Sequence, residues 1–281
     1  MAASGGWRQP SILPGFGLTL GFSTFFVSAI VLLPLGALVL RTASMSPADF
    51  FATVLAPRAL ASYRLTFGAS LLAALLNAAG GFLIAWTLVR YEFPGRRLVD
   101  ALIDLPFALP TAVSGIALTA VFAPDGWVGG WLAAQGVQVA YTWSGVVLAL
   151  TLIGLPFVVR TVQPALVEVA RDLEDAAETL GAKPFTIFRR IIFPAVLPAL
   201  VTGFTLAFAR GIGEYGSVIF IAGNLPMRTE ITPLLIVIKL EEFDYSGAAA
   251  LGFMMLLISF VMLLLINTVQ AWSRRRLTVG R

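Results

Sequence analysis

The sequence predicts an all-α polytopic membrane protein with about six transmembrane helices. Of its 281 residues, 58% are hydrophobic and only 12% are charged, whereas about a quarter of the residues in a soluble domain are charged. The charged residues are clustered and leave long uncharged stretches between them. Because roughly 20 apolar residues span the hydrocarbon core as a helix, each stretch is long enough to cross a bilayer. These stretches are Gln9–Leu40, Leu65–Val89, Leu105–Pro124, Gly126–Val159 and Tyr245–Ser273.

A sixth span is expected between the fourth and the last of these stretches, where the chain is apolar apart from Arg210 and Glu214. The first stretch is too long for the core of a signal peptide, so we expect it to be a retained span. No internal repeat is evident, and residues 1–281 are expected to form a single transmembrane domain. The expected spans lie near residues 16–40, 65–89, 102–122, 144–163, 199–222 and 248–271.

The distribution of basic residues predicts the orientation of the chain. With the N-terminus inside, 13 of the 19 lysines and arginines fall on the cytoplasmic side and five fall outside. This bias follows the positive-inside rule and predicts that both termini are cytoplasmic. Residues 1–12 are then a short cytoplasmic lead, and Arg274, Arg275 and Arg276 are a stop-transfer anchor. The net charge of +4 is explained by this bias and predicts no nucleic-acid partner.

Three connecting regions have ordinary explanations. Pro94 and Gly95 predict a basic turn after the second span, and residues 125–141 suit an external loop with interfacial tryptophans. Residues 223–245 predict an external amphipathic helix that shields the mouth of the path. Pro106 and Pro110 near the start of the third span indicate either helix packing or a broken helix that lines the path, and packing is favoured.

Missing residue types exclude most catalytic chemistry. The chain has no cysteine and no histidine, which removes disulfides, thiolate metal sites and the common proton shuttle. Its two lysines, Lys183 and Lys239, do not follow glycine, so no Walker-type phosphate loop exists. We therefore expect no catalytic residue, metal ligand or bound cofactor in this chain, and ATP would be bound by a partner.

The segment Glu168–Pro198 is a charged island between two apolar segments. Apolar residues three or four apart from Leu166 to Leu180 predict an amphipathic helix, with Pro164 in its first turn and Gly181 at its end. Pro184 is expected to open a second short helix. Such a unit is too polar to cross a bilayer, so it should lie at the membrane surface and fill a groove in a partner protein.

This segment resembles the EAA loop of ABC-importer permeases. It reads Asp175-Ala176-Ala177, then Gly181, Ile191, Phe193 and Pro194 at the family's spacing, with Asp for Glu and Phe for Leu. The resemblance implies a type I importer (MetI-like) permease fold in which residues 164–198 dock into a cleft on a separate ATPase. The residues that it implies for coupling are Glu174, Asp175, Ala176, Ala177, Glu178, Gly181, Ile191 and Pro194.

Arg210 and Glu214 are charged residues inside the fifth span. Their spacing of four residues places them on one helical face, where they can form an ion pair. Charges inside a bilayer are costly and are functional by default, and the neighbouring glycines permit close helix approach. The pair either fastens helices or subunits together or takes part in an anion path, and the sequence leaves both roles open.

The stretch Arg210-Gly-Ile-Gly-Glu214-Tyr-Gly resembles the Arg-x-x-Gly-Glu-Phe-Gly signature of sulfate and molybdate permeases. The chain around it, over residues 158–270, is most similar to sulfate/thiosulfate permeases of the T type. This resemblance implies an importer of the bacterial cytoplasmic membrane with two ATPase subunits, an external sulfate-binding protein and a second permease, either W-type or a second copy. The candidate path or interface residues are Arg210, Gly213, Glu214, Tyr215 and Gly216.

Two alternatives remain at this point. Within the class, the substrate could be molybdate, tungstate or phosphate, since a tetrahedral dianion leaves no unique mark in one subunit. Outside the class, the chain could be a secondary transporter or channel that needs no ATPase. An intramembrane enzyme is the least favoured reading.

Overall fold

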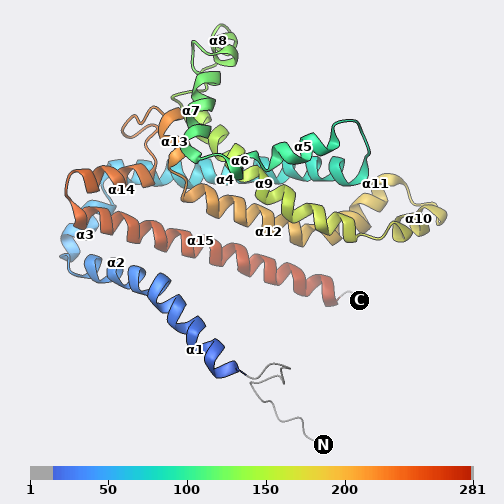
Figure 1. The fold of residues 1–281 in the computed structure, drawn as a ribbon, viewed down its shortest axis with the longest axis horizontal. Coiled ribbons are helices and arrows are strands. Elements are labelled where there is room, and N and C mark those ends of the chain that lie inside the picture. The colour runs from blue at the N-terminus through green and yellow to red at the C-terminus, as the bar shows by residue number, and fades with distance from the viewer. Residues whose placement is uncertain (1–14, 280–281) are drawn as a thin grey trace, which may run out of the picture.

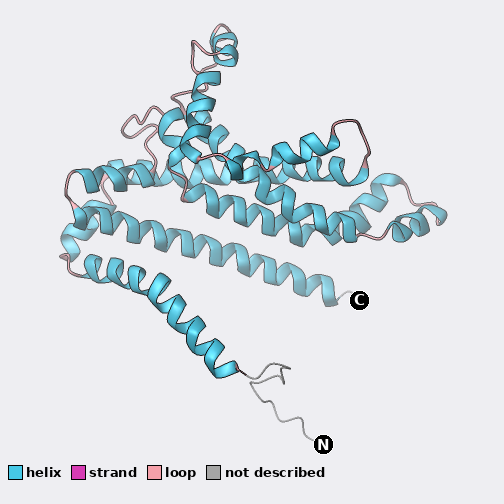
Figure 2. Ribbon diagram, in the orientation of Figure 1, coloured by secondary structure: helices cyan, strands magenta, loops and turns pink. Residues whose placement is uncertain are grey.

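A computed structural model describes the backbone of residues 15–279 and the side chains up to residue 268. Within this part every regular element is a helix, which confirms the all-α class (Figure 2). The expected lead at residues 1–12 lies outside the described residues, as do the side chains of the expected anchor at Arg274, Arg275 and Arg276.

Five helices are long and apolar enough to cross a membrane, and a sixth span results if a bent pair counts as one. The bent pair is α7 (Thr111–Phe122) and α8 (Trp127–Ala133), which meet at 44°. The finding agrees with a polytopic protein of about six spans. The five are α1–η1–α2 (Phe16–Val27, Ser28–Leu32, Leu33–Ala43), α4 (Pro57–Arg90), α9 (Trp143–Glu168), α11–η2–α12 (Pro184–Ile187, Phe188–Ile192, Phe193–Ile212) and α15 (Tyr245–Val279).

The core of the bundle is formed by α4, α9 and α12, which lie side by side (Figure 1). Val158 on α9 is fully buried between the other two helices. Opposite it, a Cβ added at Gly81 of α4 or Gly203 of α12 would come within 2.9 Å of Val158. Small residues thus let the three backbones approach closely, as is typical of membrane helices. The outer helices α2 and α15 pack against each other at the edge of this core.

Short helices connect the spans. Thr111 at the start of α7 lies beside Gly216 at the start of α13, and Figure 1 shows α7 and α8 extending away from the main bundle. The short helices are α3 (Pro47–Val54), α5 (Arg96–Ile103), α6 (Leu105–Ala108), α10 (Arg171–Thr179), α13 (Gly216–Ile221) and α14 (Thr232–Glu241).

The third span departs from the expectation. Instead of one kinked helix over residues 102–122, the chain forms α5, α6 and α7, and Leu109 between α6 and α7 is extended (φ −87°, ψ 136°). The residue before a proline avoids the helical region, so Pro110 ends the helix at Leu109. This segment is therefore a broken helix, while its small residues also pack against a neighbour as the favoured interpretation expected, with Gly115 against Ser217.

The fifth span also differs. It was expected at residues 199–222, but the helix runs over Pro184–Ile212 and stops before Gly213. The chain then turns and starts again as α13, so Glu214 lies in a break between two helices and not within one.

The amphipathic segment contains a third difference. Pro164 was expected in a first helical turn, yet it lies inside α9, which continues to Glu168. Val169 and Ala170 are extended, and α10 begins only at Arg171. Neighbouring helices in a bundle can tolerate an internal proline. Pro184 does open a helix, but this helix continues without a gap through η2 into α12.

The α7–α13 contact is tight enough to test. A Cβ at Gly115 would lie 2.3 Å from the carbonyl oxygen of Ser217, a backbone atom that cannot rotate away. We expect Gly115→Ala to lower the free energy of unfolding by roughly 1–3 kcal/mol through overpacking, which thermal unfolding of the purified protein would measure. Gly80→Ala on α4 is the matched control because a Cβ there meets nothing within 4 Å. Equal stability of the two variants would contradict the contact.

Candidate functional site

The polar loop folds as α10, a tight turn at Gly181 and α11, which we call the α10–α11 elbow (residues 171–187). Gly181 has φ +79°, a left-handed conformation that favours glycine. Its N–H donates to the carbonyl of Glu178 (2.8 Å), and the N–H of Ala182 donates to the carbonyl of Ala177 (3.0 Å). These two bonds satisfy the last carbonyls of α10 as a Schellman motif. The predicted role of Gly181 as the end of this helix is confirmed.

The elbow presents apolar side chains to the outside. No residue of α10 is buried, and Leu173 and Leu180 are 55% and 88% exposed. Phe185 on α11 is 71% exposed. Exposed apolar side chains that gather on one polar segment, as these do on the elbow, mark a surface that a partner covers.

One acidic residue of the elbow faces its own chain. Glu174 forms an ion pair with Arg90 at the end of α4, and the Arg90 guanidinium also lies 5.5 Å from the centre of the Trp86 ring. The pair ties α10 to the bundle. By contrast, Asp175 and Glu178 are exposed and take part in no ion pair within the described part of the chain.

The remaining predicted coupling residues divide between two places. Ala176 is exposed on α10 while Ala177 packs partly against the core. Ile191 and Pro194 lie further along, in η2 and the first turn of α12, and are half-buried. Ile191 contacts the main core. The structure thus places these two residues where they hold the helix to the bundle, away from the exposed face of α10.

The Arg90–Glu174 pair gives a test of how the elbow is held. We expect Arg90→Glu to lower the midpoint of thermal unfolding because two carboxylates would then repel each other where α10 meets α4. The exchange Arg90→Glu with Glu174→Arg restores the opposite charges and should recover part of the stability. Thermal unfolding of the purified proteins would compare the three; no recovery in the exchanged variant would argue against the pair.

The second predicted cluster lies in the break between α12 and α13. Arg210 Nη1 and Glu214 Oε2 are 2.6 Å apart, so the ion pair expected from the sequence is present. The side chain of Glu214 is only 2% exposed, whereas that of Arg210 is 35% exposed. The other carboxylate oxygen, Oε1, accepts hydrogen bonds from the N–H and the hydroxyl of Ser217, each at 2.9 Å. Glu214 is therefore held from three directions and caps the first turn of α13.

The glycines near this pair have separate roles. Gly216 lies against α7, because a Cβ there would be 2.2 Å from Oγ1 of Thr111. Nothing lies within 4 Å of a Cβ at Gly213, so that glycine marks the turn at the end of α12 and makes no close contact. Tyr215, between Glu214 and Gly216, packs partly against the buried cluster that includes Leu65, Val146 and Val218. The break between α6 and α7 and the break between α12 and α13 thus lie near each other, beside the ion pair.

A single helix connects the two predicted clusters. Pro184–Ile212 is continuous over 29 residues, about 43 Å at 1.5 Å per residue. It starts at the α10–α11 elbow and ends with Arg210 in its last turn. A displacement of the elbow can therefore reach the Arg210–Glu214 pair through one rigid element.

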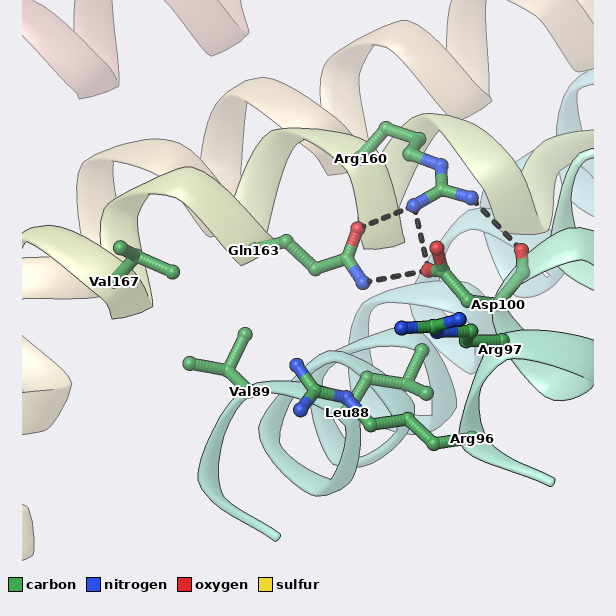
Figure 3. Close-up of a pocket in the computed structure, with 8 residues that line it drawn as sticks. All are labelled: Leu88, Val89, Arg96, Arg97, Asp100, Arg160, Gln163 and Val167. Atoms are coloured by element: carbon green, nitrogen blue, oxygen red, sulfur yellow. Dashed lines mark hydrogen bonds and ion pairs between the residues drawn. The ribbon is translucent and has the colours of Figure 1, made fainter. Parts of the chain in front are cut away.

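Sequence reasoning missed a third polar cluster. Arg160 on α9 donates to both carboxylate oxygens of Asp104 (2.8 and 2.6 Å), and to the carboxylate and carbonyl of Asp100 (2.7 and 2.8 Å). Figure 3 shows the contact between Arg160 and Asp100 together with Gln163, which bonds to both of them. The hydrogen bond from Gln163, followed by the Arg160 contact, lowers the pKa of Asp100. The cluster fastens α9 to α5 and α6.

The opposite end of the bundle has its own ion pairs. Arg58 at the start of α4 binds both oxygens of Glu230, which is buried (2.8 and 2.6 Å). In the last turn of α14, Lys239 pairs with Glu242 and Asp244, and the hydrogen bond that it donates to Glu242 raises the pKa of Lys239. The pKa of Asp244 is lowered by the N–H of Gly247. The charges of the segment over residues 223–245 thus hold this end together.

Comparison with known proteins agrees with this architecture. Residues 78–279 match the family described as "Binding-protein-dependent transport system inner membrane component". The chain is 48% identical over 265 residues to the sulfate transport system permease protein CysT of Escherichia coli strain K12, covering 94% of this chain and 96% of that one. It is 50% identical over 245 residues to the probable sulfate transport system permease protein cysT of Nephroselmis olivacea, covering 87% and 86%.

Solved structures share the fold. A bacterial ABC transporter involved in the import of the acidic polysaccharide alginate aligns with a TM-score of 0.73 at 16% identity, covering 92% of this chain and 94% of that one. The MetNI methionine ABC transporter in an inward-facing conformation aligns with a TM-score of 0.56 at 18% identity, covering 82% and 99%. The family match covers most of the chain and the CysT relatives cover nearly all of it. The chain therefore belongs to the binding-protein-dependent transport system inner membrane components of ABC importers, as a permease of the CysT type.

Proposed function

We propose that this permease carries sulfate, and thiosulfate with it, across the bacterial cytoplasmic membrane as one half of the path of an ATP-driven importer. Residues 1–281 act as one transmembrane domain with both termini in the cytoplasm. The relatives at 48% and 50% identity are named as sulfate permeases, which supports the substrate. A second permease, W-type or another copy, supplies the other half, and an external binding protein delivers the anion.

The observation that carries the ATP-driven part of the proposal is the exposed apolar face of the α10–α11 elbow. Leu180 is 88% exposed, so no side chain in the described part of the permease covers it. Such a face suits a groove on a soluble ATPase subunit. ATP and its magnesium then bind to that subunit, and this chain binds no cofactor.

Transport would proceed by movement of whole helices. When the ATPase subunits close, they push the elbow, and the continuous helix Pro184–Ile212 carries this motion into the membrane. At its far end the Arg210–Glu214 pair lies beside the two helix breaks, which are the points where the bundle can bend. An opened pair would present Arg210 to a passing anion.

Reconstituted transport tests this proposal. Vesicles that contain the purified complex should take up labelled sulfate only with internal ATP and the external binding protein, and excess molybdate should compete weakly. Preferred uptake of molybdate would show that molybdate, and not sulfate, is the substrate. Uptake driven by an ion gradient without any ATPase would contradict the proposed energy source.

A further inference from the structure

A cavity of about 480 Å³ lies beside the Arg160 cluster, at the end of the bundle that carries the α10–α11 elbow (Figures 1 and 3). It opens between the last turn of α4, the start of α5 and the end of α9. Three of its lining side chains are arginines and one is an aspartate, so the lining has a formal charge of +2. The lining residues are Leu88, Val89, Arg96, Arg97, Asp100, Arg160, Gln163 and Val167.

Arg160 has no free donor for a ligand in this cavity. A guanidinium carries five N–H groups, and Arg160 uses all five on Asp104, Asp100 and Gln163. The same bonds neutralise much of the charge on the two aspartates. Arg160 therefore forms a fixed wall of the cavity.

Arg96 and Arg97, unlike Arg160, keep their donors for a ligand. Within the described part of the chain neither forms an ion pair with a carboxylate. The two residues also line a second cavity of about 340 Å³, where Glu92 is the one acidic lining residue. Their ten N–H donors are thus available at a concave surface.

We propose that Arg96 and Arg97 form a binding site for a tetrahedral oxyanion at this end of the bundle. Arginine forks match the paired oxygens of phosphate and sulfate groups. The other wall of the cavity is apolar, since Leu88, Val89 and Val167 line it, and Val167 is 69% exposed. An oxyanion attached to an apolar body fits both walls, as in the headgroup of an anionic phospholipid. Free sulfate offers the same oxyanion without the apolar body.

Thermal unfolding of the purified full-length permease separates the two sources. Added phosphatidylglycerol, compared with phosphatidylcholine, should raise the midpoint of unfolding of the wild type. The double variant Arg96→Gln/Arg97→Gln should need a roughly thirtyfold higher concentration of phosphatidylglycerol for the same rise, as expected for the loss of two arginine contacts at a membrane surface. Sodium sulfate and sodium chloride are compared at equal ionic strength. If only sulfate raises the midpoint of unfolding, and the double variant loses this rise, the site is supported with the free anion as its ligand.

A second arginine pair provides the matched control. Arg189 and Arg190 are adjacent in sequence, exposed and at the same end of the bundle, but they line none of the described cavities. Arg189→Gln/Arg190→Gln should respond to both ligands as the wild type does. Equal responses of wild type and Arg96→Gln/Arg97→Gln would overturn the proposal. If that variant does not fold, the single variants Arg96→Gln and Arg97→Gln replace it, and responses of both that equal the wild type would overturn the proposal as well.

Discussion

Replacement of Gly181 by proline is expected to abolish ATP-dependent sulfate uptake while the spans remain inserted. Proline cannot adopt the left-handed conformation at this position (φ +79°), and it lacks the N–H that Gly181 donates to Glu178. The end of α10 would lose its cap, and the exposed face carrying Leu180 would no longer keep its position relative to α11. The measurement is uptake by membrane vesicles, with the amount of inserted permease determined in parallel.

Two further variants test the turn at Gly181 and the exposed surface of α10 separately. Gly181→Asn should retain most of the uptake because asparagine tolerates the left-handed conformation. Charge reversal at Asp175, which is exposed and has no ion pair within the described residues, should abolish uptake without changing thermal stability. Unchanged transport by Gly181→Pro would refute a coupling role for the elbow.

Loss of the Arg210–Glu214 pair is expected to have the second large effect. Glu214→Ala leaves Arg210 without its carboxylate and removes the acceptor for the N–H and hydroxyl of Ser217. Removing one partner of a fully buried pair typically costs about 3–5 kcal/mol, and the cost is smaller here because the side chain of Arg210 is 35% exposed. We expect uptake to fall at least about tenfold, which corresponds to 1.4 kcal/mol.

A double-mutant cycle identifies the source of this effect. Arg210→Ala alone should also impair uptake, and the double variant should be no worse than the more severe single variant because the two residues act together. Glu214→Gln retains an oxygen acceptor for Ser217 and should preserve stability better than Glu214→Ala. Additive losses in the double variant would show that the two residues act separately.

The sequence predicts those features that are determined by residues close together in the chain. The approximate number of spans follows from hydrophobicity, although the third and fifth differ in their course. The end of α10 follows from Gly181, whose left-handed conformation depends on its own backbone. The Arg210–Glu214 pair follows from a spacing of four residues in the chain. Each of these depends on residues close together in the sequence.

The features that the sequence does not predict depend on distant neighbours. Pro164 is tolerated inside α9 while Pro110 ends a helix, and the two differ in their surroundings more than in their flanking residues. Arg160 meets its aspartates across 56 and 60 residues of chain. A glycine such as Gly213 is compatible with both close packing and a break, and the capping by Glu214 decides between them.

The most direct test of the account is the side of the membrane from which the elbow can be reached. Because the chain has no cysteine, Leu180→Cys introduces a single thiol at an exposed position of the elbow. A membrane-impermeant maleimide should label it in inside-out vesicles only, and bound ATPase should protect it. Trp127→Cys, at a side chain 93% exposed on α8, should be labelled only in right-side-out vesicles. Labelling of Leu180→Cys from the outside, or labelling that the ATPase does not reduce, would contradict the account.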